Sequence, residues 1–151
     1  MDEQHVPDVA LAMVWVSVGW DRWDGSKGPW PDPERTASWY SLGGRALARR
    51  DDVTALMWLT RSVRNRHPGA CFRLALVKLR ADDDQTAHQW LIRAKAFGHG
   101  DALRILTEAR ACLVDGTFGS AAEERLLDAL GDVPEDPAFA AEVALLFART
   151  L

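Results

Sequence analysis

Cysteine is scarce in this sequence, since only Cys71 and Cys112 occur among its 151 residues. They lie 41 residues apart and belong to neither a Cys-x-x-Cys nor a cysteine–histidine motif, so the sequence indicates neither a zinc site nor a redox motif. Each falls within an apolar helical pattern, which predicts two reduced thiols in the core. A chain of this length buries enough surface to fold as one domain without disulfides or metal.

Long hydrophobic runs are also missing. The apolar run near the N-terminus, Val9 to Trp20, has twelve residues, fewer than the ~18 that a membrane-spanning helix needs. It is preceded by Asp2 and Glu3 rather than by the basic residues of a signal peptide. These absences predict a cytoplasmic protein that makes no contact with a membrane.

Motifs for catalysis and cofactor binding are lacking as well. The stretch Gly25–Pro29 does not have the spacing of a phosphate-binding loop, and Gly98–Gly100 is too short for a dinucleotide fingerprint. Asp82–Asp84 lacks the alternating ligands, the glycine and the distal glutamate of a calcium loop. The sequence therefore predicts no metal and no cofactor, and it favours a protein that is not an enzyme. A catalytic site assembled from distant residues is the alternative.

What the sequence does contain is an internal repeat. When Asp51–Leu74 is aligned with Asp83–Leu106, at an offset of 32 residues, ten of the 24 positions carry the same residue. About two identities are expected from average residue usage. The number of identities exceeds chance, so the sequence contains a repeat with a period of 32 residues.

Each copy of the repeat predicts a helical hairpin. Asp52 and Asp84 are expected to cap the first helix, and apolar residues then recur with the spacing of one helix face. A break follows at His67 or His99, before the second helix. The two histidines are predicted to lie at the end of the first helix, where a cation is favourable.

Weaker copies extend this pattern in both directions. Asp32 with Pro33, and Asp136 with Pro137, have the order that is typical of a helix start. Seven helices are expected from Pro33 onward, and an eighth from about residue 8 to 19.

The predicted fold is all-α, a short solenoid of seven to eight helices that stack as antiparallel hairpins in one domain, residues 1–151. Residues 1–31 are its N-terminal capping segment with a tryptophan-rich loop, 32–106 its best-defined repeats, and 107–151 a degenerate repeat with a capping helix.

The second copy resembles the Sel-one-like repeat, a relative of the tetratricopeptide repeat. The matching positions are Ala87, Trp90, Leu91, Ala94, Gly98, Ala102 and Leu106. The period is shorter than the ~34 residues of tetratricopeptide units, and aspartate turns stand in place of the longer loop of Sel-one-like units. The resemblance implies a scaffold that holds other proteins together.

Charge is distributed unevenly along the chain. Residues 1–44 carry a net charge of −4, residues 45–80 of +7 and residues 81–151 of −7. The basic segment offers a partner-binding strip, or its arginines pair with the acidic segments that flank it. The arginines considered for partner binding are Arg45, Arg49, Arg61, Arg64, Arg73 and Arg104.

Seven tryptophans are the most unusual feature of the composition. Trp58 and Trp90 occupy equivalent repeat positions and are predicted to be core residues. Trp20, Trp23 and Trp30 lie in a segment rich in glycine, proline and aspartate. They either seal the end of the stack or bind a partner.

The sequence thus predicts a protein-interaction module that holds a segment of another protein, for which an acidic partner suits the basic strip. Two alternatives remain, a nucleic-acid-binding helical repeat that uses residues 45–80 and a small enzyme or ligand-binding protein with a tryptophan-lined pocket near the N-terminus.

Overall fold

The computed structural model describes residues 33–131 and 135–151. All regular structure in these two ranges is helical: α2 (Pro33–Ala48), α3 (Asp52–Val63), α4 (Pro68–Arg80), α5 (Asp84–Ala96), α6 (Gly100–Asp115), α7 (Gly119–Ala129) and α8 (Pro137–Ala148). The predicted all-α class and the seven helices from Pro33 onward are therefore confirmed for this part of the chain. The helix expected at residues 8–19 and the capping segment 1–31 lie outside the described residues.

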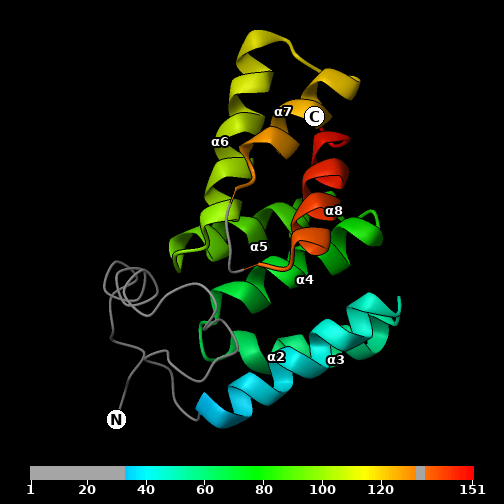
Figure 1. Ribbon diagram of the computed structural model, residues 1–151, viewed down its shortest axis with the longest axis vertical. Helices are drawn as coiled ribbons and strands as arrows, with labels where there is room; N and C mark the ends of the chain where they lie inside the picture. Colours follow the sequence, from blue (N-terminus) through cyan, green and yellow to red (C-terminus); the bar gives the residue numbers. More distant parts are fainter. Residues whose placement is uncertain (1–32, 132–134) are drawn as a thin grey trace.

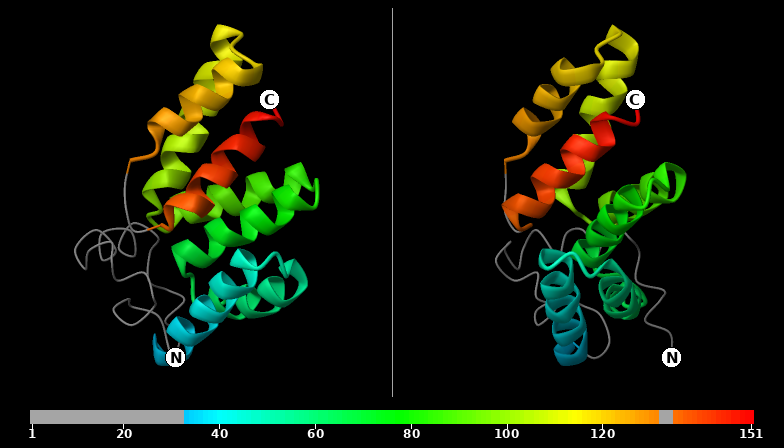
Figure 2. Two further views of the ribbon diagram at one scale, coloured as in Figure 1. Left: turned by 45° about the vertical axis from the view of Figure 1, so that its right-hand side comes forward. Right: turned by 90° about the vertical axis from the view of Figure 1, so that its right-hand side faces the viewer.

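The helices follow one another along the long axis of the molecule (Figures 1 and 2). The pair α2 and α3 lies at one end, α4 and α5 lie in the middle, and α6, α7 and α8 lie at the other end. Consecutive helices pack on each other throughout, and α8 also returns to pack on α4. None of the described helices is long and apolar enough to cross a membrane.

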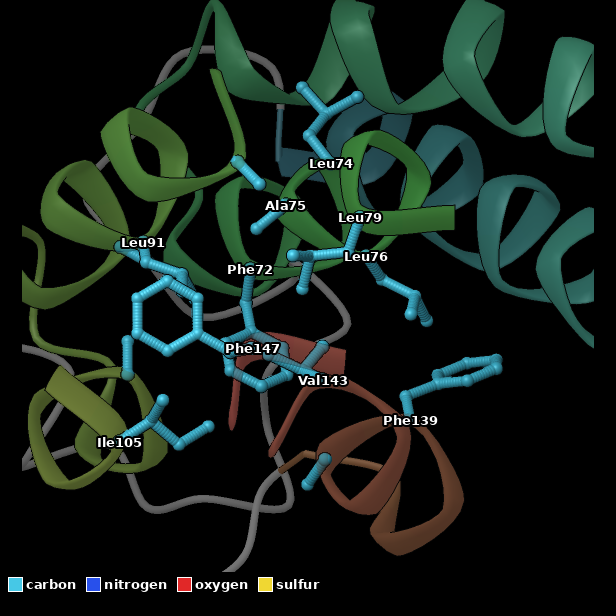
Figure 3. Close-up of a cluster of buried hydrophobic side chains, with 14 of the residues drawn as sticks. Phe72, Leu74, Ala75, Leu76, Leu79, Leu91, Ile105, Phe139, Val143 and Phe147 are labelled. Carbon is cyan, nitrogen blue, oxygen red and sulfur yellow. The ribbon is translucent and has the colours of Figure 1, made fainter. Parts of the chain in front are cut away.

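Helix α4 is the centre of this arrangement because it is buried on nearly every side. Every residue from Pro68 to Val77 is buried, as expected for a helix that is apolar all round. It contacts α2, α3, α5 and α8. Figure 3 shows Phe72 of α4 in one apolar cluster with Leu91 of α5, Ile105 of α6 and Val143 of α8. The single core therefore joins helices that are far apart in the sequence.

Aspartates cap α3 and α5, one residue earlier than the sequence suggested. The Asp51 carboxylate accepts from the backbone N–H of Thr54 at 3.2 Å, and Asp83 makes the equivalent bond at the start of α5. Asp52 and Asp84 are instead the first residues of their helices. The prediction that these two are the caps was wrong, because the capping side chain must precede the first helical residue to reach its free amides.

The two repeated histidines are also caps, at the starts of α4 and α6. His67 Nδ1 accepts from the Ala70 N–H and His99 Nδ1 from the Ala102 N–H, both at 3.1 Å. Both side chains are buried. A nitrogen that accepts a hydrogen bond carries no proton. The expectation that these histidines act as cations at the end of the preceding helix was therefore wrong.

Both cysteines are free thiols in the interior, as predicted. Cys71 lies on α4 and Cys112 on α6. Burial raises the pKa of the Cys71 thiol to about 12, so this group is protonated and neutral at physiological pH.

Candidate functional site

The arginines of α4 pair with carboxylates at the start of α8 and within it. Arg73 Nε donates to Glu135 at 2.9 Å, and Arg80 binds Glu142 through two hydrogen bonds of 2.7 Å. Both pairs have the same sequence separation of 62 residues, which means that α4 and α8 run in the same direction where they meet. Seven residues make about two helical turns, so the two arginines lie two turns apart on α4, one paired with Glu135 just before α8 and the other with Glu142 within α8.

Arg73 lies in the interior rather than on a binding surface. Its side chain is only 11% exposed, and its guanidinium lies 4.1 Å from the ring centre of Tyr40 and 4.9 Å from that of Phe139. A Cβ atom at Gly44 would lie 2.5 Å from a guanidinium nitrogen, so any larger residue at this position would require the Arg73 side chain to shift. Arg73 was considered for partner binding, but its burial does not fit that role.

Glu135 joins Arg73 to His99, and its side chain is fully buried. Its second carboxylate oxygen lies 3.1 Å from His99 Nε2, which donates because Nδ1 is the acceptor in the cap. Burial alone would raise the pKa of Glu135, but Arg73 and His99 outweigh this and lower it below its usual value. Burial lowers the pKa of His99, although Glu135 acts in the opposite direction. The cluster therefore consists of a guanidinium, a carboxylate and a neutral imidazole.

These shifts predict that the protein loses stability as the pH falls. The folded-state pKa of His99 lies below the ~6.5 of an unfolded histidine. Between these two values the unfolded chain binds more protons, so the free energy of unfolding decreases as the pH drops below about 6.5. The lowered pKa of Glu135 adds a second decrease below about pH 4.3, the usual glutamate value.

Urea unfolding at a series of pH values measures this effect. His99→Gln should make the first decrease smaller, whereas His88→Gln, which changes an exposed histidine on α5, should leave it unchanged. A free energy of unfolding that stays constant or rises between pH 7 and pH 5 would contradict the assignment of a neutral His99.

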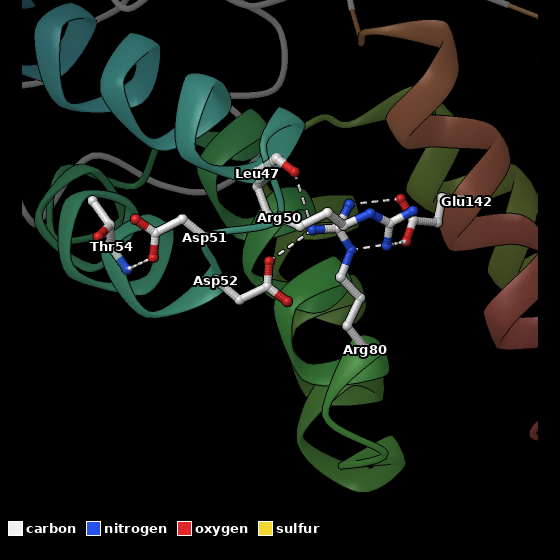
Figure 4. A network of polar contacts seen from close by, with 7 residues as sticks. All are labelled: Leu47, Arg50, Asp51, Asp52, Thr54, Arg80 and Glu142. Atoms are coloured by element: carbon white, nitrogen blue, oxygen red, sulfur yellow. Dashed lines mark hydrogen bonds and ion pairs between the residues drawn. The ribbon is translucent and has the colours of Figure 1, made fainter.

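Arg80 is the centre of a second network, where the ends of α2 and α4 meet α3 and α8 (Figure 4). It donates to Asp52 at 2.7 Å and to the backbone carbonyl of Leu47 at 3.2 Å, in addition to Glu142. Arg50 also reaches Glu142, at 3.1 Å, but its side chain is 69% exposed. The basic segment is thus partly neutralised by the acidic C-terminal part of the chain, as one of the two interpretations of the charge pattern expected.

A second set of arginines has no such partners. Arg61, Arg64 and Arg93 are exposed, and within the described ranges no carboxylate lies within ion-pair distance of them. Arg61 lies over the ring of Trp58 and Arg93 over the ring of Trp90, each at 4.8 Å from the ring centre. Such stacking is a cation–π contact. These two pairs occupy equivalent positions in the two copies of the sequence repeat.

Trp58 and Trp90 are not the core residues that the repeat predicted. Both are half-buried, and Trp90 packs with one side against the core. Each ring is also covered in part by an exposed arginine three residues further along the same helix. The apolar periodicity correctly indicated which side of α3 and α5 faces inward. It did not show that the two indole rings lie at the border of this buried side.

A pocket of about 490 Å³ lies between α3, α4 and α5, and one of the stacked pairs, Trp90 with Arg93, lines it. We call it the arginine pocket, and its lining residues are Thr60, Val63, Arg64, Arg66, Cys71, Trp90, Arg93, Ala96 and Phe97. Three of them are arginines and none is a carboxylate. Because the Cys71 thiol is protonated, every formal charge in the lining is positive. The pocket therefore combines an apolar wall with a strongly basic one.

The remaining predicted contact residues lie elsewhere. Arg45 is exposed in the last turn of α2, and Arg49 is 3.8 Å from Asp51 in the turn that follows. Arg104 on α6 is 3.3 Å from Asp101. None of them lines the arginine pocket. Trp20, Trp23 and Trp30 lie outside the described residues, so their capping and binding interpretations both stay predictions.

A larger pocket of about 810 Å³ lies between α5, α6 and the end of α8. Its apolar wall includes Ile92, Leu113 and Phe147, and its charged residues are of both signs, Asp84 with Lys95 and Arg110. No tryptophan lines it, so it is not the tryptophan-lined pocket that the ligand-binding alternative expected. Within residues 33–131 and 135–151, no three histidine, cysteine, aspartate or glutamate side chains are grouped so that they could hold a metal ion.

Comparison with known proteins identified no relative: no family model, curated protein or solved structure matches the chain.

Two features of the site were not predicted from the sequence. Glu135 was not singled out from the sequence, although its spacing from Glu142 equals that of Arg73 from Arg80. Phe97 and Arg66 lie in turns, and no sequence pattern indicated that they meet at one pocket.

Proposed function

We propose that this protein is a non-catalytic interaction module that binds an acidic segment of a partner protein. The observation that carries the proposal is the exposed surface of Arg61, Arg64 and Arg93, which have no carboxylate partner among the described residues. A protein of net charge −4 that keeps unneutralised arginines on one surface has a local field that attracts anionic groups. By contrast, Arg73 and Arg80 of α4 and Arg104 of α6 face carboxylates of the same chain.

We also infer that the helices belong to a short Sel-one-like or tetratricopeptide-like stack, in which this surface is one stretch of a longer binding groove. The equal spacing of the cap residues supports this inference, since Asp51 and Asp83, like His67 and His99, are 32 residues apart. The left-handed turn positions Arg50 and Asp82 have the same spacing. In this stack α8 closes the C-terminal end by packing on α4 and α7.

The second candidate is nucleic acid, and the stacked pairs favour it. Arginine and tryptophan together can hold a phosphate and stack on a base. However, the net charge of the chain is negative, which weakens the approach of a polyanion as long as nucleic acid. We therefore place an acidic protein segment first.

Binding of labelled probes decides between the two candidates. We expect a peptide of glutamate and serine to bind with an affinity that falls as the salt concentration rises, and a single strand of thymidines with equal charge to bind more weakly. Arg64→Glu combined with Arg93→Glu should weaken peptide binding by at least tenfold, because it places two carboxylates on the surface.

Lys95→Glu combined with Arg110→Glu is the matched control. It makes the same change in net charge, at residues that line the larger pocket, and should leave the affinity within about threefold, a difference under 1 kcal/mol. Tighter binding of the DNA strand, lost in the first variant only, would move the assignment to nucleic acid. No binding of either probe at low salt would refute the proposed function.

A further inference from the structure

The arginine pocket has an apolar wall that the binding of anions alone does not explain. An acidic side chain can bind Arg64 or Arg93 without contacting the apolar wall formed by Val63, Cys71 and Phe97. Val63, Trp90 and Phe97 each pack with part of their surface against the core, while another part faces the pocket. A ligand that bound only the arginines would leave this wall in contact with water, and the burial of apolar surface would contribute nothing to its affinity.

The charged and the apolar walls lie on the same cavity. Arg64 follows directly after the last residue of α3, Val63, and Arg93 is on α5 with Ala96. An apolar group that enters the pocket therefore has guanidinium groups beside it. A carboxylate held against one of these arginines in partly desolvated surroundings makes a charge-assisted, two-pronged hydrogen bond.

We propose that the arginine pocket takes one large apolar side chain of an acidic peptide segment, whose flanking carboxylates bind Arg64 and Arg93. This inference rests on the proposed function and makes it more specific, because it names the sequence type that is bound. The cavity of about 490 Å³ lies within the range of roughly 300–1,000 Å³ that is usual for small-molecule pockets, so it has room for one large side chain. The ligand class is a segment in which a phenylalanine or leucine stands between aspartates or glutamates.

The proposal requires that the lining residues other than the arginines carry no charge. Cys71 is the residue of the lining that belongs to α4, and it is 1% exposed. It thus lies behind the exposed wall of the pocket as a neutral group and adds no charge there. The hydroxyl of Thr60, a further polar group of the lining, donates to the Leu56 carbonyl of its own helix at 2.6 Å. The polar groups on which the proposal relies are therefore the guanidinium groups of Arg64 and Arg93.

Three peptides test the proposal on the complete chain by fluorescence anisotropy. The first has one phenylalanine between glutamates, the second has alanine in place of phenylalanine, and the third has glutamines in place of the glutamates. We expect the first to bind at least tenfold more tightly than the second, since burial of a phenylalanine contributes about that factor. The third should bind more weakly than the first by a similar factor.

A variant that fills the pocket gives the corresponding result on the protein side. Ala96 is exposed on α5 and lines the pocket, so Ala96→Trp should remove the advantage of phenylalanine over alanine and leave binding of the alanine peptide unchanged. Ala121→Trp, at an exposed alanine of α7 outside the pocket, is the control and should keep the advantage.

The outcomes separate this inference from the proposed function. Equal binding of the first two peptides, both weakened by Arg64→Glu with Arg93→Glu, would overturn the apolar pocket and leave the acidic-segment function standing. An advantage of phenylalanine that survives in Ala96→Trp would also overturn it. If none of the peptides binds at low salt, the proposed function itself is refuted and the inference with it.

Discussion

Replacing Glu135 by alanine is expected to lower the free energy of unfolding by about 3–5 kcal/mol, the range found when one partner of a buried ion pair is removed. The substitution leaves the Arg73 guanidinium, 11% exposed, without its carboxylate. It also removes the acceptor of the His99 Nε2–H. Because Arg73 lies between the rings of Tyr40 and Phe139, it cannot reach water without disturbing the packing of α2 and α8 on α4.

Urea unfolding followed by circular dichroism measures the loss. Glu123→Ala is the matched control, since Glu123 pairs at 3.1 Å with an Arg149 side chain that is 65% exposed, and such pairs contribute about 0–1 kcal/mol. If Glu135→Ala does not fold, Glu135→Gln keeps an acceptor for His99 and should give a smaller but measurable loss. Equal stabilities of Glu135→Ala and Glu123→Ala would contradict the buried cluster.

Arg80→Ala should cost about 2–3 kcal/mol, because the guanidinium makes several charge-assisted hydrogen bonds at once. It binds Glu142 through two nitrogens and also reaches Asp52 and the Leu47 carbonyl. The carboxylates that it leaves behind are 22% and 31% exposed and can be partly hydrated. The expected loss is therefore smaller than for Glu135.

Arg50→Ala provides the comparison for Arg80 within the same network. Arg50 binds the same carboxylate, Glu142, at 3.1 Å, but its side chain is 69% exposed. We expect its removal to cost less than about 1 kcal/mol. Arg80→Lys should recover only part of the loss, because an ammonium group cannot reproduce the two-pronged contact. Equal losses for Arg80→Ala and Arg50→Ala in urea unfolding would show that the network is a surface feature.

Local features of this fold could be predicted from the sequence, because they depend on residues close to one another along the chain. Proline after aspartate correctly indicated the start of α8, where Asp136 accepts from the Ala138 N–H at 2.8 Å. The aspartate and histidine turns correctly separated the helices, although the caps were misplaced or given the wrong role. A cap depends on which side chain reaches a free amide, and neighbouring aspartates cannot be distinguished by pattern alone.

Features that depend on packing between distant helices could not be predicted in the same way. The basic segment contained two kinds of arginine, but its sequence did not show that Arg73 would be buried against Glu135 while Arg64 stays without a carboxylate partner in the described chain. That division arises because the chain returns to α4 at Glu135 and along α8, and there it brings carboxylates to Arg73 and Arg80. The arginine pocket likewise exists only where α3, α4 and α5 meet.

The central claim is that the surface of Arg61, Arg64 and Arg93 binds anionic protein segments, and an exchange of charge tests it most directly. The measurement is the affinity of one glutamate-rich peptide and its lysine-rich counterpart for the wild-type protein and for Arg64→Glu with Arg93→Glu. We predict that the wild type binds the acidic peptide and not the basic one, and that the variant reverses this preference. An unchanged preference for the acidic peptide in the folded variant would contradict the claim.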